Sequence, residues 1–288
     1  MKNNPNKLGF SLLEISVILL IIGILIASVS SGKSMIKKSR ITSAQTLSAN
    51  SPVSAVDTLA IWLEPVMSDS ISEDETHKGK TISGWQNMTN YFAPQKFNIG
   101  GDPSYKESSI NKIPSINFDG DDSIDINNAI QHITGSNFAI FIVEKRDHDD
   151  GTLIASDNIE VKYDDNKFKI TQNTTAIETP GVVADGPAIN YISFASYQNG
   201  AAPVGTAYYR NKGVFIDSNG EKINPTIQPN TNTSIIPTIS NATLGAATTG
   251  FKGDISELII YGQSLTFPEL DEVLKYLSTK YQIELDRS

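Results

Sequence analysis

An acidic residue interrupts the longest apolar run in the sequence. Glu14 lies four residues after Phe10, near the start of a run that continues through Ala27. An ionised side chain within a membrane helix costs ~2.5–3.5 kcal/mol at the helix centre, so such residues usually have a function and a partner. A positively charged amine at the same depth would suit Glu14. Proteolysis after Gly9 would create one, because Phe10 would then carry a new amino terminus.

Other acidic residues could take part in glycoside hydrolysis. A retaining glycosidase needs two carboxyl groups ~5–5.5 Å apart. The closest cluster, at positions 73–75, falls in a polar stretch that is typical of a loop. Asp254 and Glu257 are three residues apart, so on a regular strand their side chains would face opposite ways. We therefore expect no enzyme. If a hydrolase activity exists, Glu75 and Glu257 are the first residues to test.

A further group of carboxylates offers oxygen ligands for a cation. Asp119, Asp121 and Asp122 are close in the sequence, and Asp125 follows them. The EF-hand spacing fails, since Ile124 stands where that motif requires glycine. A solvated acidic turn is the expected role, with Ca²⁺ binding as the alternative and no other cofactor. The sequence has no cysteine, which excludes disulfides, thiolate metal sites and cysteine nucleophiles.

The element that positions Glu14 is predicted to be one long helix. No proline occurs between Phe10 and Ser51, and Pro52 then ends the pattern. About 40 helical residues at ~1.5 Å each would extend ~60 Å, twice the ~30 Å hydrocarbon core of a bilayer. We expect this helix over residues 10–50, followed by a linker at 51–57.

Residues 58–288 carry short β patterns with turn signals between them. Few helices separate these patterns, and no βαβ units or phosphate-binding glycine motifs occur, so a mainly β fold with an antiparallel sandwich is expected. The predicted strands are 58–63, 115–118, 137–143, 159–163, 167–171, 191–197, 206–210, 213–217 and 257–261.

A single helix is predicted to close the chain. Thr266 and Glu269 have the spacing of a capping box. An apolar stripe follows at helical spacing, formed by Leu270, Val273, Leu274, Leu277 and Tyr281. We expect this helix to cover an edge of the sandwich.

Charge is unevenly distributed along the 288 residues. The chain has 23 basic and 32 acidic residues, a net charge of −9. Residues 1–50 hold six of the basic residues and one acidic residue, which leaves the remaining 238 residues with a net charge of −14. An acidic body of this size is a poor partner for nucleic acid.

The N-terminal string resembles the type IV prepilin and type II secretion pseudopilin family. The match runs from Lys7 through Gly9, Phe10 and Glu14, and it covers about residues 7–40. The resemblance implies a leader at 1–9 that a prepilin peptidase removes after Gly9. It also implies methylation of the new amino-terminal Phe10, and pairing of Glu14 with the amino terminus of a subunit during assembly. Leu8 departs from the pattern, because a basic residue often precedes the glycine.

The body resembles laminin-G-like and concanavalin A-like jelly-roll domains. The matching stretches are 60–63, 79–87, 114–122, 138–143 and 251–266, in the family's order. Members commonly bind glycans or proteins, and some cleave glycans. Trp85, Tyr91 and Tyr105 could stack on sugar rings, although buried packing is the favoured role for each.

Together these features predict a minor pilin or pseudopilin-like filament subunit with a lectin-like head for adhesion, recognition or tip capping. Expected partners are the prepilin peptidase, other pilin or pseudopilin subunits, a membrane, and a glycan or surface protein. The precursor would lie in a bacterial inner membrane, with its head in the periplasm or outside the cell. The alternatives are a singly anchored carbohydrate- or protein-binding protein and, more remotely, a glycoside hydrolase. The helix alone does not separate a pilus from a type II secretion pseudopilus.

Overall fold

The computed structural model describes most of the chain in two compact units. The described residues are 11–89, 96–130, 138–172, 175–178, 186–195, 205–210, 215–216, 222–223, 241–245 and 249–285. Gly9, Phe10 and Tyr91 lie outside them. We call the two units the stalk unit, Met1–Ser43, and the head unit, Ala44–Ser288.

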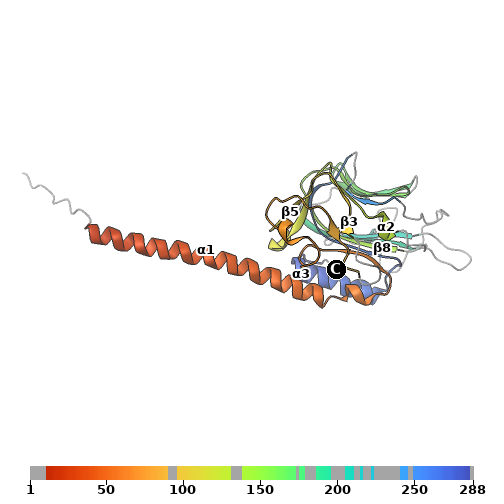
Figure 1. The fold of residues 1–288 in the computed structure, drawn as a ribbon. Coiled ribbons are helices and arrows are strands. Elements are labelled where there is room, and N and C mark those ends of the chain that lie inside the picture. Colours follow the sequence, from red (N-terminus) through yellow and green to blue (C-terminus); the bar gives the residue numbers. More distant parts are fainter. Residues whose placement is uncertain are drawn as a thin grey trace, which may run out of the picture. The chain divides into compact units, whose positions relative to one another are not determined.

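The described part of the stalk unit is helical and belongs to helix α1, which spans Leu12–Ala49 and ends three residues before Pro52 (Figure 1). The predicted helix is therefore confirmed over its described part. Its large apolar side chains between Leu12 and Ile36 are exposed. By length and composition α1 could cross a membrane. From Ala44 onward its last turns belong to the head unit, where Ala44 and Ser48 are buried.

The head unit contains two large sheets, and every strand pair named in them is antiparallel. The order of the larger sheet is β16 (Lys222–Ile223), β15 (Phe215–Ile216), β14 (Gly205–Arg210), β13 (Pro187–Ala195), β8 (Phe138–Arg146), β18 (Lys252–Tyr261), β6 (Ser115–Asp119) and β5 (Ser104–Lys106). Strand β1 (Leu59–Leu63) also pairs with β18.

The second sheet follows the order β12 (Thr175–Glu178), β11 (Lys167–Gln172), β10 (Ile159–Asp164), β9 (Gly151–Ala155), β17 (Thr243–Leu244), β7 (Ser123–Asp125) and β4 (Ile99–Gly100). The smaller elements are a β2–β3 pair (Trp85–Gln86 and Lys96–Phe97), the short helix α2 (Asn127–Ile130), and the 3₁₀ turns η1 (Pro52–Ala55), η2 (Glu73–Glu75) and η3 (Ile110–Lys112). The predicted hairpin between β10 and β11 is confirmed, and its turn residues Asp165 and Asn166 both have positive φ.

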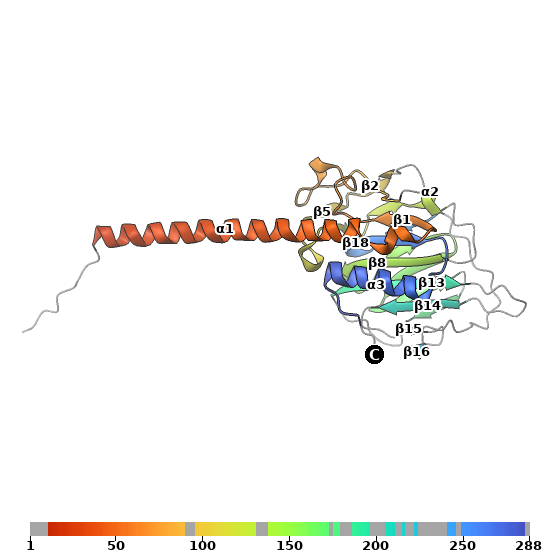
Figure 2. The ribbon, with the colours of Figure 1, turned by 90° about the horizontal axis from the view of Figure 1, so that it is seen from below.

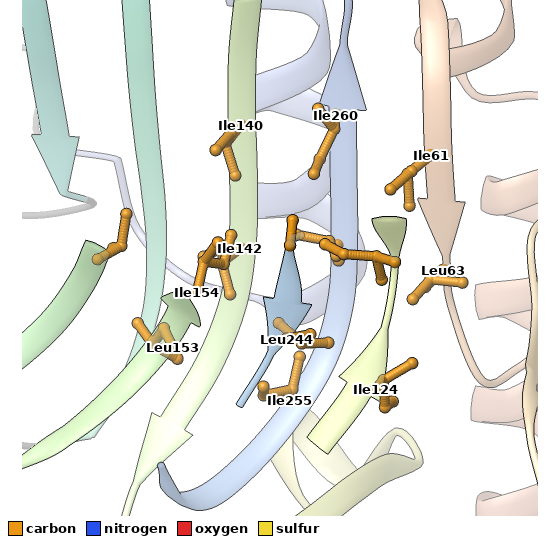
Figure 3. Packing of buried hydrophobic residues seen from close by; sticks show 14 of the residues in the cluster. Ile61, Leu63, Ile124, Ile140, Ile142, Leu153, Ile154, Leu244, Ile255 and Ile260 are labelled. Atoms are coloured by element: carbon orange, nitrogen blue, oxygen red, sulfur yellow. The ribbon is translucent and has the colours of Figure 1, made fainter. Parts of the chain in front are cut away.

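Apolar side chains from both sheets fill the space between them. Figure 3 shows Ile142 of β8 beside Ile154 of β9, and Ile140, Leu153 and Leu244 belong to the same cluster. These residues have at most 2% of their surface exposed. The two sheets therefore form a β-sandwich with one continuous core.

Helix α3 (Phe267–Tyr281) covers the opposite face of the larger sheet (Figure 2). Its capping box is confirmed, since the backbone N–H of Thr266 donates to Glu269 Oε2 at 2.7 Å. The apolar stripe of α3 packs on Phe141 of β8, Tyr191 of β13 and Ile259 of β18. Our prediction that this helix covers a sandwich edge was wrong, because its partners are the central strands of the sheet.

The segment 51–57, which we expected to form a linker, is packed into the head unit. It forms η1, and its residues Val53 and Val56 belong to the same apolar cluster as α3. The hydroxyl of Tyr261 donates to the carbonyl of Val53 at 3.1 Å. The connection between α1 and β1 is therefore tied to the sheet.

Strand β18 changes neighbours along one of its sides. Its residues up to Ile255 pair with β6, and its residues from Leu258 pair with β1. Against β8 on the other side, Ser256 and Glu257 form a bulge, in which the register shifts by one residue. We call this junction the seam. It places Ser256 and Glu257 where neither β6 nor β1 pairs with them.

Candidate functional site

The N-terminal motif is described from Ser11 onward. Glu14 lies in the first turn of α1, and its Oε2 accepts a hydrogen bond from the backbone N–H of Ser11 at 2.9 Å. A carboxylate near a helix N-terminus is favoured because the free backbone N–H groups there carry partial positive charge. Gly9 and Phe10 lie outside the described residues, so cleavage and pairing with an amine remain predictions.

A buried polar cluster occupies the seam beneath α3. Lys280 lies at its centre with no exposed side-chain surface. Its ammonium group is 2.8 Å from Glu257 Oε2, 3.0 Å from Glu64 Oε2 and 2.8 Å from Ser48 Oγ. These partners come from β18, the end of β1 and the end of α1. One cation thus joins four segments of the head unit.

Glu257 is the better satisfied of the two carboxylates. Its Oε1 accepts from the indole N–H of Trp62 at 2.8 Å and from the hydroxyl of Tyr276 at 3.0 Å. Its Oε2 lies 2.8 Å from both the Lys280 ammonium and the Tyr281 hydroxyl. Four donors around two oxygens are what a buried carboxylate anion requires.

The cluster raises the pKa values of Lys280, Tyr276 and Tyr281, for different reasons. Burial by itself would lower the pKa of Lys280, but the charges of Glu257 and Glu64 outweigh it and hold that pKa well above its usual value. Burial, followed by the charge of Glu257, raises the pKa of Tyr276 and Tyr281 well above the ordinary value. The lysine is therefore charged and the tyrosines are neutral hydrogen-bonding groups.

The candidate hydrolase residues are not arranged as a catalytic pair. Glu257 is fully buried and bound to Lys280, so a sugar ring cannot reach it without opening the cluster. Glu75 lies in η2, where its Oε1 accepts from the backbone N–H of Ser83 at 3.1 Å. Glu75 has the exposed residues Glu73 and Asp74 beside it in η2, whereas Glu257 has no exposed surface to offer a substrate.

Our prediction that Asp254 and Glu257 face opposite ways was wrong, because the bulge in β18 adds one residue between them. Both side chains leave the sheet on the face away from the inter-sheet core. Asp254 binds Lys106 at 2.8 Å and Asn117 at 2.9 Å, whereas Glu257 binds α3. Each is fully buried in a separate set of partners.

The structure brings three of the predicted cation ligands together. Asp119, Asp121 and Asp122 join Asp102, and one carboxylate oxygen of each lies within 4.8 Å of the others. Asp125 is elsewhere, on β7, where it accepts from the backbone N–H of Asn127. Oxygen donors of this kind suit Ca²⁺.

Asp122 also has a structural role within this group. Its two oxygens accept from the backbone N–H groups of Asp102 and Asp119 at 2.8 and 2.9 Å. Burial raises the pKa of Asp122. The pKa of Asp121 is raised by a hydrogen bond between the side chains of Asp121 and Asp119. The exposed carboxylates of Asp102, Asp119 and Asp121 are the ones that could hold a cation.

The aromatic residues considered for sugar stacking are packed inside. Trp85 has no exposed surface, and its indole N–H donates to Ser70 Oγ at 3.0 Å. Tyr105 is 6% exposed and belongs to the core cluster between the sheets. The favoured role, buried packing, is confirmed for both residues.

Sequence reasoning missed Glu64, Lys280 and Asp102. Glu64 directly follows an apolar strand, and Lys280 stands within an amphipathic helix beside Tyr281. A basic residue that falls within the apolar stripe of a helix is a signal for a buried ion pair. Asp102 carries no such local signal, because its partners are 17 or more residues away.

No protein-family model matches the sequence, and a comparison with curated proteins finds no match. Among solved structures, a mutant of Trypanosoma rangeli sialidase displaying trans-sialidase activity is similar, with a TM-score of 0.51 and 13% identity. The match covers 91% of this chain and 40% of the sialidase. This chain therefore spans less than half the length of that protein.

Two carbohydrate-related structures are also similar. Domain 4 of a GH43 extracellular arabinanase from Geobacillus stearothermophilus, in complex with arabinotriose, has a TM-score of 0.45 and 18% identity over 75% of this chain and 97% of that domain. The Ruminococcus gnavus IT-sialidase CBM40 bound to α2,3 sialyllactose has a TM-score of 0.41 and 14% identity over 54% of this chain and 93% of that chain. The likeness to the Trypanosoma rangeli sialidase is one of fold.

The ion pair of Lys280 yields a direct prediction. Lys280→Met keeps an unbranched side chain but leaves Glu257 and Glu64 buried without their cation, so we expect a loss of about 3–5 kcal/mol in unfolding free energy. Lys275→Met is the matched control, because Lys275 lies on the same helix in an exposed pair with Asp271. That change should cost less than about 1 kcal/mol. Denaturant unfolding of the full-length protein in detergent measures both, and equal losses would contradict a central role for Lys280.

Proposed function

We propose that this chain is a filament subunit of the type IV pilin or pseudopilin class, with the head unit as a recognition or capping module. The observation that carries the proposal is Glu14, an acid in the first turn of a long apolar helix, four residues after Phe10. Such an acid needs a positive partner in an apolar environment. The amino terminus created by cleavage after Gly9 supplies that partner.

The exposed apolar surface of α1 supports this proposal. Its large apolar side chains from Leu12 to Ile36 are exposed, and exposed apolar surface of this extent is costly in water. A membrane would cover them in the precursor, and sister helices would cover them in a filament. The resemblance further implies a prepilin peptidase and other pilin or pseudopilin subunits as partners.

The head unit supports the recognition half of the proposal. It is a β-sandwich similar in fold to the Trypanosoma rangeli sialidase mutant, and we infer a jelly-roll head of the laminin-G-like or concanavalin A-like kind. We propose a glycan or a surface protein as its ligand and binding, rather than hydrolysis, as its activity. The burial of Glu257 supports this choice, since that residue was one of the two hydrolase candidates.

Processing and assembly test the first half of the proposal. We expect the purified protein to have lost residues 1–9 and gained one methyl group by intact mass. Glu14→Gln should retain cleavage but reduce incorporation into filaments at least ~10-fold, because the neutral side chain no longer pairs with an ammonium group. Shearing and quantification of the filament fraction measures incorporation in the native host.

Ser16→Ala is the matched control for the Glu14 variant. Ser16 lies on the same helix, and its hydroxyl donates only to its own helix, at the carbonyl of Leu13. This variant should assemble normally. Persistence of the nine-residue leader, or normal assembly of Glu14→Gln, would leave a singly anchored binding protein as the better account.

The activity of the head is tested by binding without turnover. We expect the full-length protein in detergent to be retained on a glycan or protein array and to release no product from a polysaccharide panel. Turnover that Glu75→Gln or Glu257→Gln abolishes would instead favour a glycoside hydrolase. Absence of retention on every ligand class would remove the recognition half of the proposal.

A further inference from the structure

We infer that Glu64 is a proton-binding site within the head unit, and that its ionisation loosens the joint between the end of α1, α3 and the seam. This inference concerns the head unit alone. It does not depend on whether the chain assembles into a filament.

The charges in the buried polar cluster do not balance when all its acids are ionised. Lys280 is one cation, and both Glu64 and Glu257 lie within 3.0 Å of its ammonium group. All three side chains have zero exposed surface. An unpaired buried anion is costly in an apolar interior, and a buried carboxyl group usually takes up a proton instead.

The hydrogen bonds indicate which carboxyl group holds the proton. Glu257 has four donors around its two oxygens, which favours its anion. Glu64 Oε2 has the Lys280 ammonium at 3.0 Å and the backbone N–H of Val66 at 3.2 Å. Glu64 Oε1 is buried and has no hydrogen-bond partner among the described residues. Glu64 is therefore the carboxyl group that is less able to remain ionised.

The groups that face Glu64 come from every element packed around it. They are Lys280, Tyr276 and Tyr281 from α3, Glu257 from β18 and Tyr105 from β5. Burial raises the pKa of Glu64 above its usual value of 4.5, Lys280 opposes that shift, and Glu257 adds to it. Burial is the largest of these effects, so geometry and titration agree.

Ionisation of Glu64 would act on the joint through Lys280. The same ammonium donates to Ser48 Oγ at the end of α1, and Ser48 lies 3.2 Å from the hydroxyl of Tyr276. A second anion beside Glu257 would repel it and require water at the seam. The segments that meet there, α3 and the end of α1, would then be held less firmly.

The sign of the pH dependence follows from the raised pKa. A carboxyl group whose pKa is higher in the folded protein contributes stability that is complete below about pH 4.5 and is lost as the pH rises through its folded pKa. In the Glu64→Gln variant the side chain keeps the same shape and is neutral at every pH. The Tm of wild type should therefore fall by at least ~3 °C relative to the Tm of the Glu64→Gln variant when the pH is raised from 5 to 8.

Thermal unfolding of the full-length protein in detergent, at pH 5, 6, 7 and 8, tests the inference. Glu272→Gln is the matched control, because Glu272 is exposed on α3 and should leave the wild-type pH profile unchanged. Parallel Tm profiles for wild type and Glu64→Gln would overturn the inference. So would a wild-type Tm that rises relative to Glu64→Gln as the pH increases.

A second measurement decides the matter if Glu64→Gln does not fold. Hydrogen exchange of wild type should show α3 amides exchanging at least ~3-fold faster at pH 8 than at pH 6, after correction for intrinsic exchange rates. In Glu257→Gln one carboxyl group remains for one ammonium, so this excess should disappear. Equal corrected rates at both pH values in wild type would overturn the inference.

Discussion

The packing of helix α3 and the end of α1 on the larger sheet depends on the buried ammonium group of Lys280. The side chain of Lys280 has no exposed surface, and its ammonium group binds one glutamate from β18 and one from the end of β1. Removal of a charged group from water is expensive, so this arrangement persists only where partners are complete and well placed. The cluster therefore fixes where α3, β1 and the end of α1 lie relative to the larger sheet.

The seam explains why such a cluster is present in an otherwise apolar layer. Two strands share one side of β18, and the residues between them, Ser256 and Glu257, have neither β6 nor β1 as a ladder partner. Buried backbone groups need hydrogen-bond partners. The hydroxyl of Tyr281, from α3, lies 3.1 Å from the carbonyl of Ser256 and 2.8 Å from Glu257 Oε2, so its one proton is shared between these two acceptors. The helix thus completes the sheet as well as covering it.

The local features of this fold could be predicted from the sequence. Strand periodicity located β1, β8, β10 and β11, and the spacing of Thr266 and Glu269 located the start of α3. These signals arise between residues that are near in the chain. The turn at Asp165 and Asn166 is of the same kind, because both residue types tolerate positive φ.

The features that were missed arise from contacts between distant segments. The bulge at Ser256 and Glu257 has no local signature, and it reverses the face on which Glu257 lies. The seating of α3 on the sheet face depends on how strands from across the chain are ordered. Asp102 joins Asp119 through folding alone. Glu14 is different: its role follows from sequence and physical chemistry, and it remains a prediction.

The most direct test is whether the ammonium group of Lys280 is protected from exchange with water. NMR spectra of full-length protein labelled with ¹⁵N-lysine, in detergent micelles at neutral pH, would detect a lysine ammonium group that exchanges slowly with water. We predict one such protected ammonium signal, absent from Lys280→Met and present in Lys275→Met. If every lysine side chain exchanges at the rate of exposed groups, the buried cation does not exist as described and the account is wrong.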